Sequence, residues 1–230
     1  MRIRAALLCL LVAVLLPGCA TAPQTPVGFA GNYFDTRTGR IGVVMSEIPK
    51  PDTAFPGADC LLCLATASIA NSDMTSAVQT WSADELNPLK AELAAALKAR
   101  GQHTVTIDEA LKMDSVPDRS GAEPGFARKD FSSWKQRAGL DRLLVVNLRA
   151  LGARRNYSAY VPIGAPRAVF QVEAYIVDLA SHKLDWYESF DLARLAEGNW
   201  DEPPKFPGLT NAYFQVLEEG KDAIKRAFSK

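Results

Sequence analysis

The sequence is poor in the side chains and motifs from which most catalytic and metal sites are built. Its 230 residues include only two histidines and four cysteines, and His103 and His182 lie far apart in the chain. The patterns Gly-x-Ser-x-Gly and His-Glu-x-x-His are absent, as is a glycine-rich phosphate loop before a lysine. A structural zinc site typically needs four clustered Cys, His or carboxylate ligands. We therefore expect no metal, no cofactor and no enzymatic activity.

Net charge and long apolar runs are also missing. The chain has 26 basic and 26 acidic side chains, for a formal net charge of zero. It therefore lacks the broad positive field with which proteins attract nucleic acids. After the N-terminal region, the most apolar stretch is Cys60–Ala70, whose 11 residues are far fewer than the roughly 20 that cross a bilayer. We expect neither a nucleic-acid partner nor a membrane-spanning segment in the mature chain.

The N-terminal region carries the clearest signal in the sequence. Arg2 and Arg4 precede an unbroken apolar run, Ala5–Leu16, whose 12 residues suit the core of a signal peptide. This run leads into Leu16-Pro17-Gly18-Cys19. A small residue directly before a cysteine resembles the lipobox of bacterial lipoproteins. The resemblance implies that Cys19 receives a diacylglycerol, that residues 1–18 are removed, and that the new amine is acylated as well, for example by palmitate.

The same resemblance implies a location. In Gram-negative lipoproteins an aspartate after the acylated cysteine marks retention at the inner membrane, and here that position is Ala20. The resemblance thus implies a cell-envelope lipoprotein on the periplasmic face of the outer membrane, with the bilayer as partner of its acyl chains. Residues 19–37 begin with a stretch rich in Pro, Thr, Gln and Gly, which predicts a flexible tether. Residues 38–230 are predicted to form one periplasmic domain.

Hydrophobic periodicity predicts that this domain is of the α/β (α+β) class, a single-domain sandwich of a mixed sheet with helices in the order β-α-α-β-α-β-β-β-α. The expected strands are 40–45, 103–107, 143–148, 169–179 and 184–190, and the expected helices are 60–70, 82–101, 130–139 and about 213–228.

Three strands allow finer predictions. The run 143–148 is apolar at every position but Asn147, so we expect it at the centre of the sheet with both faces covered. In the next strand the even-numbered residues Phe170 to Ile176 are expected to share a face, because successive side chains alternate. In the last strand Leu184, Trp186 and Phe190 are expected to do the same.

This order of elements resembles the α/β domain of envelope proteins such as the TolB N-terminal domain, the curli-secretion lipoprotein CsgG and penicillin-binding-protein activator lipoproteins. The features that carry it are the strand 41–45, the helix 86–101 leading into Val105, and the segment 140–146. The resemblance covers about residues 38–228. It transfers no partner-binding residue to this chain.

Cys60-Leu61-Leu62-Cys63 is the one group of residues in the sequence whose spacing suggests disulfide or redox chemistry. We expect it to start a helix that Asp59 caps and that is buried nearly all round. The i, i+3 spacing allows a disulfide, and a helix N-terminus stabilises a thiolate. The neighbouring Asp59 opposes a thiolate by like-charge repulsion. Buried apolar cysteines, a structural disulfide and a redox pair all remain open.

The sequence therefore favours a non-enzymatic, membrane-anchored periplasmic lipoprotein that binds another envelope component as an adaptor or assembly factor. One alternative is a subunit of a CsgG-like secretion oligomer. A second alternative is a periplasmic thiol oxidoreductase that uses Cys60 and Cys63.

Replacing Cys19 with Ala is expected to release the mature domain from membranes, because two or three acyl chains supply nearly all of its bilayer affinity. The measurement is the fraction of protein that sediments with membranes after a high-salt wash. The variant should carry a leader whose removal does not depend on Cys19, so that an uncleaved signal peptide cannot act as an anchor. Full retention after that wash would contradict a single lipid anchor.

Overall fold

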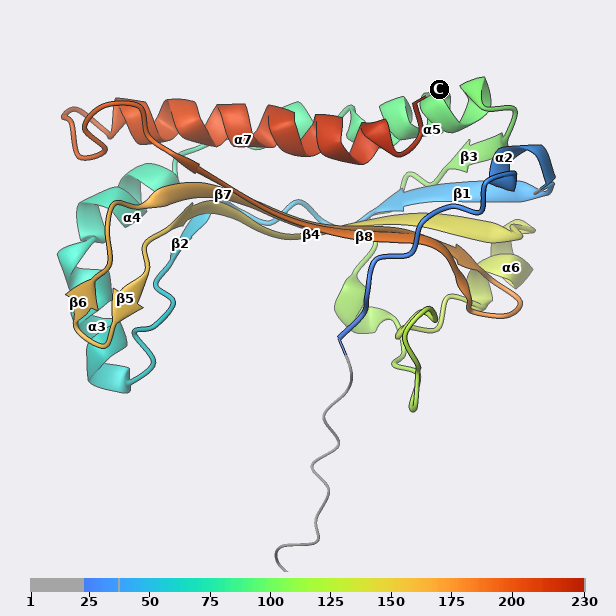
Figure 1. Ribbon diagram of the computed structural model, residues 1–230, viewed down its shortest axis with the longest axis horizontal. Coiled ribbons are helices and arrows are strands. Elements are labelled where there is room, and N and C mark those ends of the chain that lie inside the picture. Colours follow the sequence, from blue (N-terminus) through green and yellow to red (C-terminus); the bar gives the residue numbers. More distant parts are fainter. Residues whose placement is uncertain (1–22, 37, 230) are drawn as a thin grey trace, which may run out of the picture.

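The computed structural model describes residues 23–36 and 38–229, and these form one mixed β-sheet with helices (Figure 1). The main path through the sheet is β3-β1-β4-β7-β8, and a short strand, β2, pairs with the far half of β4. The strands are β1 (Arg40–Met45), β2 (Asp52–Ala54), β3 (His103–Thr106), β4 (Arg142–Arg154), β7 (Arg167–Asp178) and β8 (Leu184–Leu195).

Strand directions confirm the predicted mixed sheet. Strand β1 runs parallel to both β3 and β4, whereas β4, β7 and β8 form an antiparallel meander. The expected central strand is central: β4 lies between β1 and β7. It is also much longer than predicted, because it continues for 13 residues and keeps β7 as its partner throughout.

Two helices lie along one face of the sheet, which is the upper face in Figure 1. They are α5 (Leu89–Ala99) and α7 (Pro207–Arg226). Four shorter helices, a small hairpin and two 3₁₀ turns complete the described chain: α2 (Tyr33–Thr36), α3 (Leu61–Ala70), α4 (Ser72–Val78), α6 (Ser133–Ala138), strands β5 (Tyr157–Ser158) and β6 (Val161–Pro162), and the turns Asp84–Leu86 and Met113–Ser115. In the described part of the chain, none of the helices combines the length and apolar character that crossing a membrane requires.

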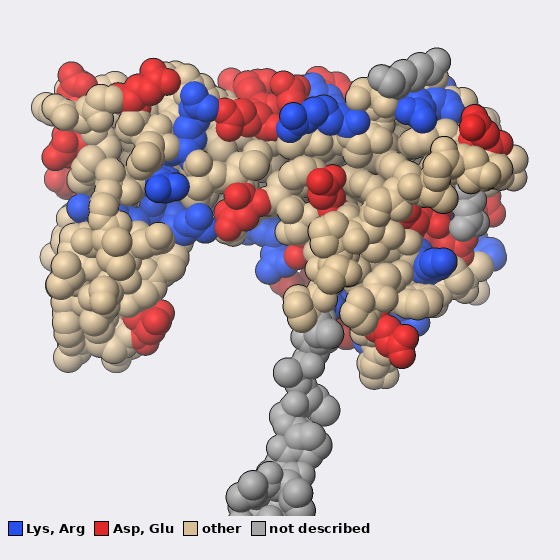
Figure 2. Space-filling model, viewed as in Figure 1, with Lys and Arg blue, Asp and Glu red and all other residues tan. Residues whose placement is uncertain are grey.

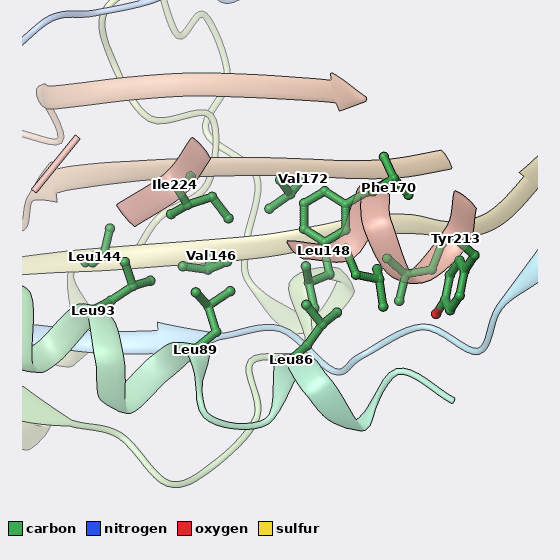
Figure 3. Close-up of a cluster of buried hydrophobic side chains, with 14 of the residues drawn as sticks. Leu86, Leu89, Leu93, Leu144, Val146, Leu148, Phe170, Val172, Tyr213 and Ile224 are labelled. Atoms are coloured by element: carbon green, nitrogen blue, oxygen red, sulfur yellow. The ribbon is translucent and has the colours of Figure 1, made fainter. Parts of the chain in front are cut away.

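The larger hydrophobic core lies between these two helices and the sheet. Figure 3 shows leucines from the Asp84–Leu86 turn and α5 meeting alternate side chains of β4 and β7, with α7 closing the other side. The predicted face of β7 is confirmed, since Phe170, Val172, Ala174 and Ile176 all belong to this core. Helix α7 approaches so closely that a Cβ on Gly220 would stand 2.5 Å from the ring of Phe170. Glycine is thus required where helix and strand meet.

A second core fills part of the opposite, lower face. Leu143 and Val145 of β4 belong to it, whereas Leu144 and Val146 belong to the upper core. This confirms that the start of β4 is apolar on both faces. Its cover comes from residues 107–140, which contribute Phe131 and Leu140. The segment 114–129 takes part as well, because Val116 and Ala127 are buried.

The folded domain begins earlier than residue 38. Within the predicted tether, the backbone N–H and C=O of Val27 both pair with Tyr187 at 2.9 Å. Phe29 stacks on Trp186, and Tyr33 is almost fully buried. Phe29 and Tyr33 thus attach this segment to the domain. The composition of the segment, rich in proline, glycine and threonine, did not indicate that attachment. Residues 19–22 of the tether lie outside the described residues.

Arg142 fixes this N-terminal segment to the sheet. Its side chain is 1% exposed, and its guanidinium donates to the hydroxyl of Tyr33 at 2.8 Å and to the backbone oxygen of Thr38 at 2.9 Å. It also donates to Gln102 at 3.3 Å. A buried cation is tolerated only when its donors are satisfied in this way.

Two local predictions were wrong. Leu184 does not share a face with Trp186 and Phe190, because a bulge beside Ile176 and Val177 shifts the register and turns Leu184 into the lower core. The long helix does not start at residue 82. Asp84–Leu86 forms a separate 3₁₀ turn, and α5 begins after Pro88.

The largest error concerns the helix 60–70. It forms, as α3, but only Cys63 and Ala67 are buried within it. Leu61 is 87% exposed, Leu62 70% and Ile69 76%. A run that is apolar all round gives no directional signal, so it was placed in the core by default. Its N-cap is Cys60 and not Asp59.

Val145→Asp is expected to unfold the domain, because a buried unpaired carboxylate costs several kcal/mol and a whole domain has only about 5–15 kcal/mol. The control is Val161→Asp, the same change at a valine that is 65% exposed. Circular dichroism and thermal melting should show loss of structure for the first variant and native behaviour for the second. Native melting of Val145→Asp would contradict a central position for β4.

Candidate functional site

The lower face of the sheet carries a cleft beyond the point where its hydrophobic cover ends. The cleft has a volume of about 550 Å³. Asn147 and Arg149 of β4 line it, together with Glu173 and Tyr175 of β7 and Tyr187 of β8. Figure 2 shows the molecule hollowed below the sheet, between two parts that project downward.

Glu173 is the electrostatic centre of this cleft. Its carboxylate accepts a hydrogen bond from Arg149 at 2.7 Å and another from Asn147 at 3.4 Å. Arg149 takes part because β4 is irregular between Leu148 and Ala150, where one extra residue leaves the ladder. Basic and acidic groups from residues 113–129 face the same space, namely Asp114, Asp118, Arg128 and Lys129. The cleft therefore offers both signs of charge.

Two tyrosines form the apolar wall of the cleft. Burial, with the negative charge of Glu173 second, raises the pKa of Tyr175 far above its ordinary value. The same two causes raise the pKa of Tyr187. Both phenols therefore stay neutral at physiological pH. Their rings are stacked, with centroids 6.0 Å apart, beside the charged groups.

One of the two downward projections is an apolar arm, made of residues 55–70 and 157–163 and seen at the left of Figure 1. Its small core consists of Ala58, Cys63, Ala67 and Tyr157. Its surface exposes large apolar side chains from α3 and from the β5–β6 hairpin: Leu61, Leu62, Leu64, Ile69, Tyr160, Val161 and Ile163. Asp59 is the arm's one charged residue.

A buried asparagine holds the two halves of the arm together. The Nδ2 of Asn71 donates to the hydroxyl of Tyr157 at 2.6 Å and to the carbonyl of Ala67 at 2.7 Å. Its Oδ1 accepts from Arg155 at 2.9 Å. Where the arm joins the sheet, Gly152 has φ +128°, and a Cβ there would lie 2.1 Å from the backbone oxygen of Asp52. Only glycine permits that approach between β2 and β4.

The cysteine pair lies at the tip of this arm. Cys60 and Cys63 form a disulfide, with Cα atoms 4.9 Å apart. Cys60 is exposed, whereas Cys63 is 3% exposed. The sulfur of Cys60 also accepts the backbone N–H of Cys63 at 2.9 Å, which caps α3.

The structure does not bring the other sequence candidates together. His103 lies on β3 at the edge of the sheet, and His182 lies in the β7–β8 turn near Asp130, at 3.8 Å. Within residues 23–36 and 38–229, no group of three or more His, Cys, Asp or Glu side chains is arranged to hold a metal ion. Cys19 lies outside the described residues.

Sequence reasoning missed the cleft. Neither Glu173 nor Arg149 was among the candidate residues predicted from the sequence. A signal was present: polar residues at 147, 149, 171 and 173 interrupt otherwise apolar strands at alternate positions. Such alternation indicates a polar face, and neighbouring strands must then place these side chains together.

Comparison with known proteins gives only distant similarity. No family model matches the chain, and no curated protein matches it. Among solved structures, protein XCC0632 from Xanthomonas campestris is 11% identical, with a TM-score of 0.40, over 91% of this chain and 95% of that one. The lipoprotein GNA1162 from Neisseria meningitidis is 17% identical, with a TM-score of 0.28, over 81% and 98%. The PelC dodecamer from Paraburkholderia phytofirmans is 10% identical, with a TM-score of 0.30, over 84% and 92%. Similarity at this level assigns no function.

Replacing both Cys60 and Cys63 with Ser is expected to lower stability only mildly. The disulfide closes a very short loop, so it removes little entropy from the unfolded chain. Cys63 enters the small core of the arm, where a hydroxyl is less favourable than a sulfur. Thermal melting should therefore show a small shift with the sheet intact. A large loss of stability would show that the arm and the sheet fold as one cooperative unit.

Proposed function

We propose that this protein is a lipid-anchored lipoprotein of the bacterial envelope, without enzymatic activity, on the periplasmic face of the outer membrane. In this proposal Cys19 carries the acyl chains, and the domain binds another envelope component as an adaptor or assembly factor. The binding site is the cleft beside Glu173, and its occupant is a polar segment of an envelope protein.

The observation that carries the proposal is the short connection between the anchor and the sheet. Val27, which pairs with Tyr187 at the edge of the sheet, follows Cys19 by eight residues. A fully extended chain of that length spans at most about 28 Å. Acylation of Cys19 would therefore hold the lower face of the sheet, with its cleft, close to the membrane.

The composition of the cleft supports a polypeptide as its occupant. Arg149 and Glu173 offer a donor and an acceptor side by side, and the stacked rings of Tyr175 and Tyr187 offer an apolar surface. A peptide segment presents backbone donors and acceptors along with side chains, so it can use all of these groups. A site for an anion alone would lack the carboxylates of Asp114, Asp118 and Glu173.

Site-specific crosslinking in the intact envelope tests this proposal. A photoreactive amino acid at Met113, which lines the cleft, is expected to form an adduct with another envelope protein. Glu173→Lys should reduce that adduct several-fold, because it places a second cation beside Arg149 and removes the acceptor. The measurement is the adduct's yield on a gel, with its partner identified by mass spectrometry.

The matched control is Glu202→Lys, the same change at an exposed residue outside the cleft. Equal adduct yields from Glu173→Lys and Glu202→Lys would contradict the cleft as the binding site. Adducts that contain only copies of this chain would instead support the alternative of a CsgG-like oligomer subunit.

One observation favours a second candidate function, thiol–disulfide exchange. Cys60 is exposed at a helix N-terminus while Cys63 is buried, which is the arrangement of an attacking and a resolving cysteine. The exchange would break the Cys60–Cys63 bond, form one in a substrate, and require an envelope oxidant to restore the pair. In the Cys63→Ser variant the resolving thiol is missing, so a mixed disulfide between Cys60 and a substrate should accumulate. If Cys63→Ser yields no such adduct, the bond is structural.

A further inference from the structure

The apolar arm exposes several large hydrophobic side chains to water. Leu61, Leu62 and Ile69 are each at least 70% exposed, and Val161 and Ile163, in and directly after β6, are also exposed. These side chains lie on one projection. Large apolar side chains exposed together on one projection indicate a contact with another protein or with a membrane.

The chemistry of the arm favours a lipid surface. A protein interface usually surrounds its apolar centre with a charged and hydrogen-bonding rim. Here the whole arm, residues 55–70 and 157–163, contains a single charged side chain, that of Asp59. Within α3 and the β5–β6 hairpin, the exposed polar side chains carry hydroxyls, among them that of Tyr160. Tyrosine is characteristic of the boundary between lipid headgroups and acyl chains, because its ring is apolar and its hydroxyl remains hydrated.

The position of the arm agrees with this chemistry. The arm projects from the lower face of the sheet, and the described chain begins on that same side, as the dark blue segment in Figure 1 shows. The first described residue, Pro23, is four residues after Cys19. A lipid attached to Cys19 would therefore bring the membrane to the side on which the arm projects. Figure 2 shows that side of the arm almost free of Lys, Arg, Asp and Glu.

The arm is also built to hold its shape without such a contact. The bond from Asn71 to Tyr157 fixes the end of α3 against the hairpin, and the Cys60–Cys63 disulfide closes the first turn of α3. Strand β2 attaches the arm to β4 through a three-residue parallel pairing. A rigid apolar tip loses little conformational entropy when it binds.

We propose that the apolar arm inserts shallowly into the lipid leaflet that holds the acyl chains of Cys19, and so fixes the orientation of the domain on the membrane. At ten residues, α3 is too short to span a bilayer and would lie in the headgroup region. Lipid anchor and arm then form two separate contacts. The inference rests on the proposed lipid anchor, which supplies the nearby membrane.

Fluorescence quenching on the lipidated full-length mature chain tests this inference. Ile163→Cys introduces one reactive thiol, since Cys19 is acylated and Cys60 and Cys63 are joined. That thiol is labelled with an environment-sensitive dye, and the labelled protein is reconstituted into vesicles of phosphatidylethanolamine and phosphatidylglycerol. Quenching is compared between spin-labelled lipid and aqueous iodide. The reference position is Asp222→Cys, on the exposed side of α7 on the opposite face of the sheet.

The expected result is several-fold stronger lipid quenching at position 163 than at 222, with the opposite order for iodide. Equal access of iodide to both positions would overturn the inference. A dye at 163 that neither quencher reaches would also overturn it, because the arm would then be covered by protein, either a second copy or another partner.

A second pair of variants separates insertion from folding. Leu62→Asp in the Ile163→Cys chain puts a carboxylate on a side chain that is 70% exposed, so the fold should persist. A charge in the apolar interface is unfavourable, and lipid quenching at 163 should fall to the level seen at 222. Leu62→Met keeps the surface apolar and should leave the quenching unchanged.

Failure of the anchor is distinguishable from failure of this inference. Without acylation, the protein incorporates no palmitate and does not float with vesicles. A protein that incorporates palmitate and floats, but whose arm stays accessible to iodide, refutes the insertion alone.

Discussion

The continuous pairing of β4 with β7 is the constraint on which the rest of the molecule depends. The ladder runs from Arg142 opposite Asp178 to Arg154 opposite Arg167. At about 3.3 Å per residue, a 13-residue strand is roughly 43 Å long. The hydrophobic cover of the lower face ends well before that distance. The uncovered half of the ladder becomes the roof of the cleft, and its far end carries the apolar arm.

Unequal cover of the two faces explains where polar groups gather. Helices α5 and α7 cover the upper face (Figure 1), and the residues that point toward them are apolar along the ladder, from Leu144 to Ala153 on β4. On the lower face, apolar residues stop at Val145, and Asn147 and Arg149 follow. Each face is therefore apolar only where another element removes it from water, as the hydrophobic effect requires. The cleft exists because that cover is incomplete.

The start of the described chain, the cleft and the arm lie on one side of the sheet, which gives the proposed functions a common geometry. The N-terminal segment is fixed at Val27 and again by Arg142 through Tyr33, so a lipid on Cys19 could not drift far from the lower face. Insertion of the arm, as proposed, would limit the remaining freedom. A domain held at two points would present its cleft in a constant orientation to a component that lies along the membrane. A long flexible tether would offer no such orientation.

The sequence by itself determined the class of the fold and most of its elements, because these follow from periodic patterns that are local. The doubly apolar run at 143–148 identified the central strand, and the alternation at 170–176 identified the core face of its neighbour. Tertiary structure alone decided three matters. The bulge beside Val177 reversed the side of Leu184, and a bulge of this kind depends on the partner strand. The aromatic residues of 27–34 pack against Trp186 of β8 and Phe228 after α7. They follow no periodic pattern, so the sequence did not indicate these contacts. Helix α3 is apolar on every side, so its pattern could not say whether protein, lipid or water surrounds it. Only the limited extent of the core, which ends before the arm begins, left that helix exposed.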